Sequence, residues 1–420
     1  MSKALEPSKA ACRICQEPIL NRVWELKPCV YGDLFTSDQD VALKIESHSL
    51  CLSTCSSCGL LQLDQLTDLK MQYDDYLYHT KITFGLSEFY KNLAQKLTNE
   101  VHGRIRTALD IGSNDGSFLR ELKNNGFSVL GIEPADKPSK AANESGIRTI
   151  RRYFDYQLAL ELHRDFGEFE LITMNYALAN VPNLQEIFRG VERLLAEKGI
   201  FSVVTGYHPD QFSVNMFDYV GHDHLTYLTI RDLKFIGERH GLNIFAVERV
   251  EHKGGSVVVH FCRKDSGIKK SNSVHQLLQR EDWQQVDSTK FILDLKSRVD
   301  EQKNLLLNYL KENRIENLLG IGASISTTYL ANYLGVSDRL AYLFDDDSNK
   351  WNCFSPGSGT RVLPMSEVSQ QNNKFAILLA WQHTNRILER LRDSNFLGTL
   401  LIPLPYFRTL NFSQASSKFN

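Results

Sequence analysis

The sequence lacks any long apolar run. No stretch of its 420 residues approaches the roughly 20 consecutive apolar residues that span a bilayer. The N-terminal stretch MSKALEPSKAACRIC also lacks the apolar core of a secretory signal. We therefore expect a cytoplasmic protein that has no membrane partner.

An excess of either charge is also absent. The chain has 48 Lys and Arg against 50 Asp and Glu, for a formal net charge of -2. Because the two signs are interspersed, the sequence shows no broad positive surface of the kind that binds nucleic acid. We expect a small-molecule substrate and no nucleic-acid partner, and no pattern predicts the oligomeric state.

Cysteine is scarce beyond the N-terminal region, since six of the eight cysteines lie in the first 58 residues. In a reducing compartment, such clustering favours metal binding over disulfides. CRIC (12–15) and CSSC (55–58) form two CxxC pairs, and four thiolates complete a closed, tetrahedral, structural zinc site. Cys51 or His48 are the nearest substitutes, and unrelated free cysteines are the alternative. The predicted ligands are Cys12, Cys15, Cys55 and Cys58.

From residue 107, short strand and helix patterns alternate, which predicts a parallel sheet with right-handed crossovers. NIFAVERVEH and GSVVVHFCRK add a hairpin-like pair of strands, and the polar residues 265–285 are expected to form a linker. A long helix and a second alternating unit follow. The predicted fold class is α/β. The predicted domains are a small zinc-binding domain (1–70), a Rossmann-like domain (71–265) and a C-terminal Rossmann-like domain (266–420).

The stretch LDIGSNDGSFL (109–119) lacks the lysine of a phosphate loop and the third glycine of a dinucleotide fingerprint. Asp110 ends a strand, and Glu133 follows about 20 residues after the loop, where an acidic group accepts hydrogen bonds from a ribose. Asp110 is placed to accept from an α-amino group. This combination suits S-adenosylmethionine (SAM), although glycines that merely close a turn are the alternative. The predicted cofactor residues of this region are Asp110, Gly112, Ser113, Asn114, Gly116, Glu133, Pro134 and Asn175.

The linear order of the motifs resembles the three-domain nucleotide-sugar C-methyltransferases. The motifs are CRIC…CSSCGLLQL, LDIGSNDGSFLREL, GIEPA, GIGASISTTYLANYLG…FDDD, AWQHTNRI and IPLP, from about residue 12 to 408. The resemblance implies that residues 1–70 form a zinc domain and that residues 71–265 form a SAM-binding methyltransferase domain of class I. It implies that residues 266–420 form a domain that helps to hold the nucleotide sugar. It also implies methylation at C-3 of a deoxysugar carried on thymidine diphosphate.

The resemblance implies further site residues. Tyr76 and Tyr78 fall on a tyrosine-rich stretch that covers the donor. Gly320, Gly322, Ala323 and Ser324 form a glycine turn at which backbone amides and a helix N-terminus can meet a diphosphate. Asp345 in FDDD grips a ribose or simply begins a solvated loop.

The polar pocket departs from the pattern of this family. Gly221 stands where the family has tyrosine, while Asn180 and Lys253 stand where it has histidines. His224 remains as a base for removing a proton next to a C-4 carbonyl. Asn180 and Lys253 are candidates to replace the lost groups near the enolate oxygen or the diphosphate. The predicted catalytic residues are His222, Asp223, His224 and Asn180, with Lys253 as a substrate-binding residue.

Other readings stay open. The HDH triplet also suggests a second metal, but alternating residues of an extended segment face opposite sides, and no third ligand is spaced near it. An O- or N-methyltransferase acting on a sugar or another phosphorylated small molecule needs only one base and correct placement. A non-catalytic SAM-binding scaffold is a further alternative, and a nucleic-acid methyltransferase is a weaker one because the chain is near neutral.

Overall fold

A computed structural model describes residues 10–18, 20–30, 34–64, 85–101 and 106–412. Its contacts divide the chain into two compact units. Unit 1 comprises Met1–Asn21, Ser53–Asp210 and Asp223–Ser288, and unit 2 comprises Arg22–Leu52, Gln211–His222 and Thr289–Asn420. These units do not coincide with the three predicted domains, whose boundaries stay a prediction.

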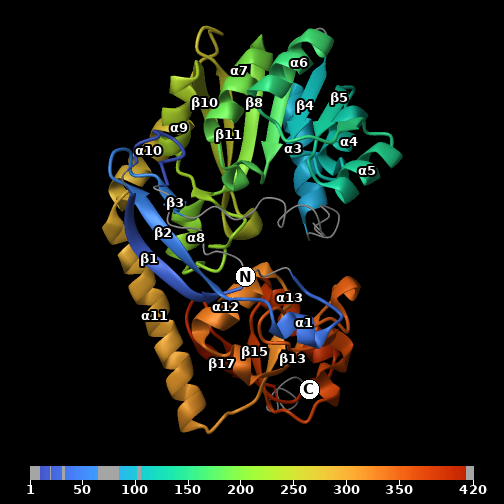
Figure 1. Ribbon diagram of the computed structural model, residues 1–420, viewed down its shortest axis with the longest axis vertical. Coiled ribbons are helices and arrows are strands. Elements are labelled where there is room, and N and C mark those ends of the chain that lie inside the picture. Colours follow the sequence, from blue (N-terminus) through green and yellow to red (C-terminus); the bar gives the residue numbers. More distant parts are fainter. Residues whose placement is uncertain (1–9, 19, 31–33, 65–84, 102–105, 413–420) are drawn as a thin grey trace, which may run out of the picture. The chain divides into compact units, whose positions relative to one another are not determined.

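The main element of unit 1 is a seven-stranded sheet with the order β10-β11-β8-β7-β4-β5-β6 (Figure 1). Strand β11 runs antiparallel to both β8 and β10, whereas β8, β7, β4, β5 and β6 run parallel to one another. The strands are β4 (Thr107–Ile111), β5 (Ser128–Ile132), β6 (Thr149–Ile150), β7 (Phe169–Asn175), β8 (Leu195–Gly206), β10 (Leu242–Val250) and β11 (Ser256–Arg263).

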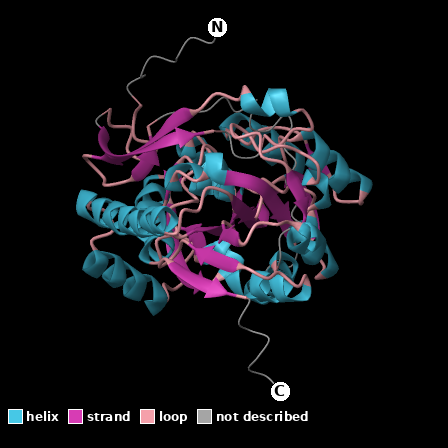
Figure 2. Ribbon diagram, turned by 90° about the horizontal axis from the view of Figure 1, so that it is seen from below, coloured by secondary structure: helices cyan, strands magenta, loops and turns pink. Residues whose placement is uncertain are grey.

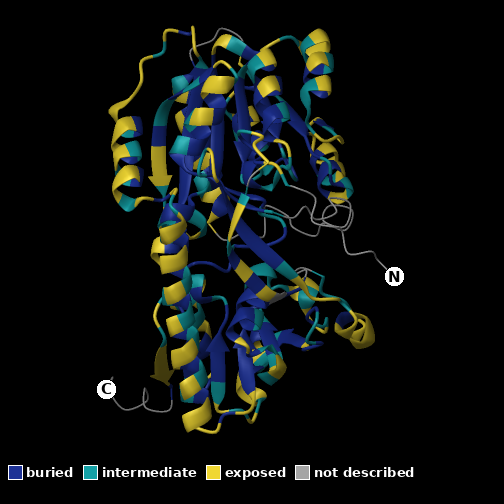
Figure 3. Cartoon of the chain, turned by 60° about the vertical axis from the view of Figure 1, so that its left-hand side comes forward, coloured by how far each residue is buried: buried dark blue, intermediate teal, exposed yellow. Residues whose placement is uncertain are grey.

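Helices cover both faces of this sheet because its central strands are apolar on both sides. In β4, Leu109 and Ile111 pack into the cluster that contains α6, α7 and α9, while Ala108 packs with α3, α4 and α5 on the other face. Figure 3 shows the strands as buried ribbons and the helices with exposed outer faces. The helices are α3 (Leu86–Glu100), α4 (Ser117–Asn124), α5 (Asp136–Glu144), α6 (Tyr156–Phe166), α7 (Leu184–Leu194), α9 (Ile230–Arg239) and α10 (Asn272–Gln284), with short η2 (Leu178–Asn180) and η3 (His252–Gly254). Helix α8 (His208–Ser213) falls on the division between the units.

The expectation of a linker over residues 265–285 is wrong, because most of this segment forms α10. Val274, Leu277 and Glu281 lie on one side of the helix at helical spacing and are buried. The carboxylate of Glu281 accepts from Tyr207 Oη and from the backbone amide of Ile230 at the start of α9. The polar composition concealed a narrow apolar face.

A smaller sheet has the order β1-β2-β3-β9, formed by β1 (Leu20–Cys29), β2 (His48–Cys55), β3 (Leu61–Leu63) and β9 (Thr226–Tyr227). Helix α1 (Gln39–Leu43) follows β1. Strands β3 and β9 pair antiparallel within unit 1. This pairing brings the segment after the HDH triplet next to the segment after the CSSC cysteines.

Unit 2 contains a six-stranded sheet with the order β14-β13-β12-β15-β16-β17, in which β17 is antiparallel to β16. The strands are β12 (Leu318–Ile321), β13 (Leu340–Asp345), β14 (Val362–Pro364), β15 (Phe375–Leu378), β16 (Thr399–Ile402) and β17 (Arg408–Asn411). The helices are α11 (Thr289–Glu312), α12 (Ile325–Leu334) and α13 (Thr384–Asp393), with short η4 (Ser337–Arg339), η5 (Ser348–Lys350), η6 (Met365–Gln370) and η7 (Trp381–His383). Figure 2 distinguishes helices from strands by colour.

Both large sheets therefore have a mixed α/β, Rossmann-like architecture, which confirms the predicted fold class. Within the described parts of the chain, no helix is both long and apolar enough to cross a membrane.

Candidate functional site

The loop after β4 lies at the topological switch point of the seven-stranded sheet, where the strand order reverses between β4 and β7. Ligands of open α/β sheets bind at the carboxyl ends of the strands at such a point. Gly112 and Gly116 both adopt left-handed backbone conformations there, with φ of 75° and 72°. A Cβ atom on Gly112 would lie 2.8 Å from Cβ of Ala177, which follows β7, so the turn depends on glycine.

Asp110 lies beneath this loop and is only 2% exposed. Its Oδ1 accepts from Thr173 Oγ1 at 2.7 Å and from Asn175 Nδ2 at 3.4 Å, both on β7. Burial raises the pKa of Asp110 to about 7, although the Thr173 hydrogen bond lowers it. The carboxyl group therefore changes charge near neutral pH, so a cation placed beside it would favour the ionised form.

Glu133 directly follows β5, and its carboxylate holds the loop after β4 in place. Its Oε2 accepts from the backbone amide of Asn114 at 2.9 Å, and its Oε1 accepts from that of Ala135 at 2.8 Å. Burial raises its pKa, while these two amides oppose the shift. Each carboxylate oxygen has a second lone pair, so Glu133 can still accept from a ligand. Pro134 follows it and is partly exposed.

Three polar atoms around the loop have no hydrogen-bond partner in the part of the chain that the structure describes. They are Ser113 Oγ, Asp115 Oδ2 and Asn175 Oδ1. Buried polar atoms usually have partners, and bound ligands are one way to supply them. The residues at this switch point therefore fit a polar ligand that contains a ribose and an amino group, as SAM does.

Residues 223–225, the part of the HDH segment (222–225) that belongs to unit 1, approach the same end of the sheet. The backbone amide of Leu225, the residue after His224, donates to the carbonyl of Ala179 at 2.9 Å. Ala179 precedes Asn180, whose Oδ1 has no partner among the described residues. Asp223 Oδ1 lies 3.4 Å from Nδ1 of His224, and the two side chains are 25% and 32% exposed. The structure thus brings the predicted residues His224, Asp223 and Asn180 to one region of unit 1.

His222 belongs to unit 2, so the division between the units falls within the HDH triplet. Its Nδ1 lies 3.0 Å from the hydroxyl of Tyr329, and its ring meets that of His48 edge-on at 6.2 Å. His222 is 5% exposed. The His222 side chain therefore contacts Tyr329 on α12 and His48 at the start of β2.

Lys253 adopts a left-handed conformation with φ of 53°. Its Nζ lies 4.1 Å from the centroid of the Tyr176 ring, a cation–π distance. Tyr176 directly follows Asn175, so Lys253 also lies at the carboxyl end of β7. The structure places this predicted residue near the loop after β4 (residues 112–116), which is called the donor loop below.

The four predicted metal ligands converge. The Sγ atoms of Cys12, Cys15, Cys55 and Cys58 all lie within 4.8 Å of one another. Backbone amides of Cys15 and Ser57 donate to Cys12 Sγ and Cys55 Sγ at 3.5 and 3.4 Å. Sulfur atoms bound to one tetrahedral zinc at about 2.3 Å lie somewhat under 4 Å apart. The set therefore fits a closed four-thiolate site, and Cys51 and His48 are not part of this cluster.

The second glycine turn lies at the corresponding switch point of unit 2, between β12 and β15. Gly322 has φ of 109°, and a Cβ atom on it would lie 2.6 Å from Cβ of Ala380. The amide of Ala323 donates to Asp345 Oδ2 at 2.7 Å, and the amide of Ser324 donates to Thr327 Oγ1 at 2.7 Å. Gly320, in β12, abuts Leu343. The diphosphate role of this turn stays a prediction, and two of its amides already have protein partners.

The family descriptions match two consecutive parts of the chain. "Methyltransferase domain" matches residues 85–247, and "C-methyltransferase C-terminal domain" matches residues 251–405. The C-methyltransferase NovU of Streptomyces niveus is 23% identical over 412 residues, which cover 95% of this chain and 96% of NovU. The chain is therefore similar to C-methyltransferases over nearly its whole length. It is a SAM-dependent methyltransferase.

Among solved structures, this methyltransferase is similar to the SAH-bound magnesium protoporphyrin IX methyltransferase of Synechocystis PCC 6803. The identity is 12%, with 43% of this chain and 88% of that chain covered and a TM-score of 0.36. The PH0226 protein of Pyrococcus horikoshii OT3 is 13% identical, with 48% and 100% covered and a TM-score of 0.35. Similarity at this level says nothing about the function of this chain.

Sequence reasoning missed Tyr176 and His252. The hydroxyl of Tyr176 lies 3.2 Å from His252 Nδ1, and the His252 ring stacks on Phe89 at 5.4 Å. The rings of Tyr176, His252 and Phe89 therefore form a cluster of aromatic side chains next to Lys253. The signal was present, because His252 immediately precedes the position at which a family histidine is replaced. Tyr76 and Tyr78 lie outside the described residues.

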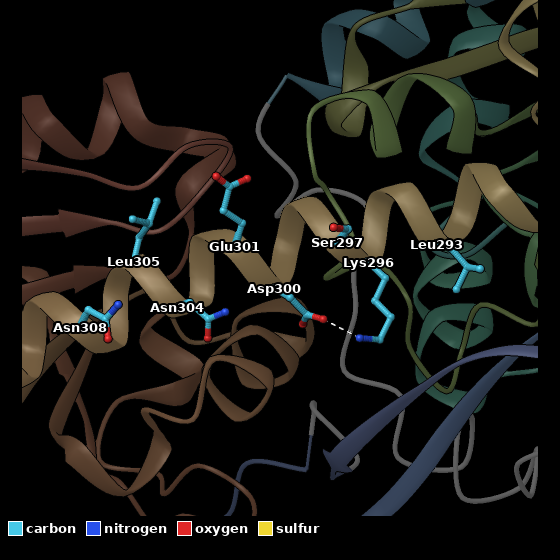
Figure 4. Close-up of a pocket in the computed structure, with 8 residues that line it drawn as sticks. All are labelled: Leu293, Lys296, Ser297, Asp300, Glu301, Asn304, Leu305 and Asn308. Carbon is cyan, nitrogen blue, oxygen red and sulfur yellow. Dashed lines mark hydrogen bonds and ion pairs between the residues drawn. The ribbon is translucent and has the colours of Figure 1, made fainter.

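A hollow along α11 is lined by residues of that helix alone (Figure 4). Lys296 Nζ and Asp300 Oδ2 form an ion pair at 2.5 Å across one helical turn. A hollow walled by one helix offers no converging groups, so it is not a candidate active site. Its lining residues are Leu293, Lys296, Ser297, Asp300, Glu301, Asn304, Leu305 and Asn308.

Proposed function

We propose that this methyltransferase methylates a carbon atom next to a keto group of a nucleotide-linked sugar, with His224 as the base. One observation carries the proposal. Asn175 contacts Asp110 next to the donor loop, and Ala179, close behind it in the chain, holds Leu225 beside His224. One short segment after β7 therefore links the donor-binding residues with the base.

The donor loop supplies groups of the right charge for SAM. The carboxylate of Asp110 would accept from the α-ammonium group, and Glu133 would accept from the ribose hydroxyls. Ser113, Asn114 and Asn175 would contribute further polar contacts, while Gly112 and Gly116 shape the turn and Pro134 follows Glu133. When bound, SAM supplies an electrophilic methyl group on a sulfonium.

His224 would take the proton from the acceptor carbon. The electron pair of that C–H bond would move toward the adjacent carbonyl and give an enolate. SAM held by the donor loop would supply the methyl group for the new bond to carbon, with S-adenosylhomocysteine as the leaving group. Asp223, 3.4 Å from Nδ1 of His224, would orient the ring and stabilise its protonated form. The proton stays on the imidazole until the product leaves.

The developing enolate oxygen needs a donor or a positive charge. The side-chain amide of Asn180 and the ammonium of Lys253 are the proposed sources, and both lie at the carboxyl end of β7. Asn180 ends η2 and is partly exposed, and Nζ of Lys253 lies over the ring of Tyr176.

We propose that residues 266–420 help to bind the nucleotide. The turn after β12 repeats two features of the donor loop: a glycine packed against an alanine across the switch point, and an acidic residue after the next strand that accepts from a loop amide. In unit 2 these residues are Gly322 with Ala380 and Asp345 with Ala323. This repeated geometry favours a second nucleoside site, with Ser324 and the start of α12 facing the diphosphate.

The four-cysteine cluster would hold a structural zinc ion. Because four thiolates complete a tetrahedral shell, no coordination position remains for substrate. The metal would therefore act through the fold of residues 12–58 and not in the methyl transfer.

Solvent exchange tests the role of His224 directly. A thymidine-diphosphate 4-keto-deoxysugar is incubated in D2O with the protein and S-adenosylhomocysteine, so that no methyl group is available. We expect deuterium to enter at C-3 with wild-type protein and not with His224→Ala. Absence of exchange in the wild type, together with methyl transfer to a hydroxyl or amine, would contradict carbon methylation.

A further inference from the structure

Arg13 lies between the first two cysteines of the metal cluster, yet its side chain points to the HDH segment. The side chain is buried, with 8% of the residue exposed. Its Nη1 donates to the carbonyl of Leu63 at 2.7 Å and to the carbonyl of Leu225 at 3.1 Å. Leu225 directly follows His224, so a residue of the cysteine turn is bonded to the chain beside the proposed base.

Leu225 is held from both sides. Its carbonyl accepts from Arg13 and also from the backbone amide of Leu63 at 3.0 Å, while its own amide donates to Ala179. Leu225 is 1% exposed. The peptide groups at Leu225 therefore have little conformational freedom, and they hold the backbone next to His224 in place.

Arg13 is itself held firmly. Its backbone amide donates to Gln62 Oε1 at 2.9 Å. The next carbonyl, that of Ile14, accepts from Gln185 Nε2 at 2.5 Å, and Gln185 Oε1 accepts from His240 Nε2 at 2.6 Å. These bonds fix the cysteine turn against α7 and the end of α9.

Of the two groups that hold the carbonyl of Leu225, one lies within a cysteine turn and the other lies shortly after one. Arg13 follows Cys12 directly, and Leu63 ends β3, which starts shortly after Cys58. An ion bound to all four sulfurs joins the two turns. Removal of this ion would uncouple the two turns, and with them the two groups that donate hydrogen bonds to the carbonyl of Leu225.

We infer that Arg13 is a positioning residue for His224 and couples the metal cluster to the proposed base. This inference rests on the proposed function for its effect on turnover, but not for its structural part. A guanidinium fits the role because its donors lie in a rigid planar fork and it stays charged when buried. The metal cluster then has a role at the reaction site without contacting substrate.

The tests use Arg13→Met, which removes the donors but keeps an apolar stem, and Arg13→Lys, which keeps one donor group. Arg263→Met is the matched control, because Arg263 Nη1 also donates to two backbone carbonyls, those of Glu192 and Leu195, at 2.8 and 3.2 Å. Arg263 lies at the end of β11, and neither carbonyl belongs to the HDH segment. Both methionine variants lose the same kind of bond.

The first readout is hydrogen exchange of peptides that cover residues 223–228. We expect Arg13→Met to accelerate exchange there by about tenfold relative to Arg263→Met, because local opening becomes easier when two supporting bonds are lost. Removal of the metal from wild-type protein should accelerate the same peptide. Equal exchange in the two methionine variants would overturn the inference, whatever reaction the protein catalyses.

The second readout separates catalysis from binding. With an active acceptor, we expect Arg13→Met to lower kcat by about tenfold or more and to alter its pH dependence, with Arg13→Lys in between, because misplaced groups lose effective molarity. The dissociation constant of SAM should stay within about twofold, since the donor loop is separate. If no acceptor is methylated by the wild type, the proposed function fails while the exchange result still decides the role of Arg13.

Discussion

The backbone amide of Leu225 donates to the carbonyl of Ala179 over 2.9 Å, which joins the residue after His224 to the residue before Asn180. The two segments are distant in sequence, since Ala179 lies in η2 and Leu225 directly precedes β9, which begins at Thr226. This bond places a candidate base and a candidate donor to the enolate oxygen in one region.

His224→Gln should lower kcat by about 10²–10⁴-fold, the usual contribution of a general base, while SAM binding is retained. Calorimetry with SAM and a turnover assay for S-adenosylhomocysteine measure the two effects. His275→Gln, on the exposed side of α10, is the control and should behave as wild type. Full turnover in the His224 variant would remove this residue from the mechanism.

Asp110 should make SAM binding depend on pH. Because its pKa in the folded protein is about 7, the carboxyl group is mostly neutral below that pH and cannot pair with an ammonium group as an anion. We expect the affinity for SAM to fall by up to about tenfold per unit as the pH drops below 7, and to level off above it. Asp110→Asn should bind weakly with no such slope, and an unchanged slope would contradict the assignment.

The same group affects stability in the opposite direction. Its folded-state pKa is raised by burial, so its stabilising contribution is fully present below the pKa of an unfolded aspartate, near 4, and is lost as the pH rises through about 7. Without ligand, Asp110→Asn should therefore melt a few degrees higher than wild type at pH 8 and nearly alike at pH 4. Thermal melts at both pH values measure this difference.

Gly131→Ala, a substitution in β5, should displace the donor loop at Ser113. A Cβ atom there would lie 2.4 Å from Ser113 Oγ and 2.8 Å from Thr149 Oγ1, so the loop has to shift. We expect SAM to bind about tenfold more weakly or worse, since small displacements of positioning groups are costly.

Gly322→Ala is the matched variant of the second turn, where the new Cβ would lie 2.6 Å from Ala380. It should leave SAM binding within about twofold and raise the KM of the nucleotide-sugar acceptor, because the two turns belong to separate sheets. Loss of SAM binding in a folded Gly322→Ala protein would argue against a separate nucleotide site.

The metal cluster predicts one zinc ion per chain, measurable by elemental analysis of protein purified without chelators. Cys12→Ser should abolish stoichiometric zinc and lower the melting temperature, because a structural ion contributes directly to folding. Cys353→Ser should keep the ion, since Cys353 Sγ donates to the carbonyl of Asn349 and lies outside the cluster. A wild-type protein without zinc would refute the assignment.

The sequence predicted the fold class well because the alternation of strands and helices from residue 107 is a strong local signal. The polar segment 265–285 misled because α10 buries a narrow face that includes Glu281, a charged residue satisfied by Tyr207 and two backbone amides. Such a partner set arises only from tertiary structure.

The candidate site was predicted unevenly for a similar reason. The donor loop and the four cysteines have characteristic spacings, so local sequence was sufficient to propose them. The contacts of Arg13 with Leu225, and of Lys253 with Tyr176, join residues far apart in the chain and have no short motif. The contact between Tyr176 and His252 could be found only when β7 and η3 were placed together.

The position of the transferred methyl group tests the central claim most directly. The protein is supplied with SAM carrying a ¹³C methyl group and a thymidine-diphosphate 4-keto-deoxysugar, and the product is examined by ¹³C NMR. The account predicts a methyl carbon bonded to C-3 of the sugar, with loss of the C-3 proton. A methyl group bonded to oxygen or nitrogen would contradict it.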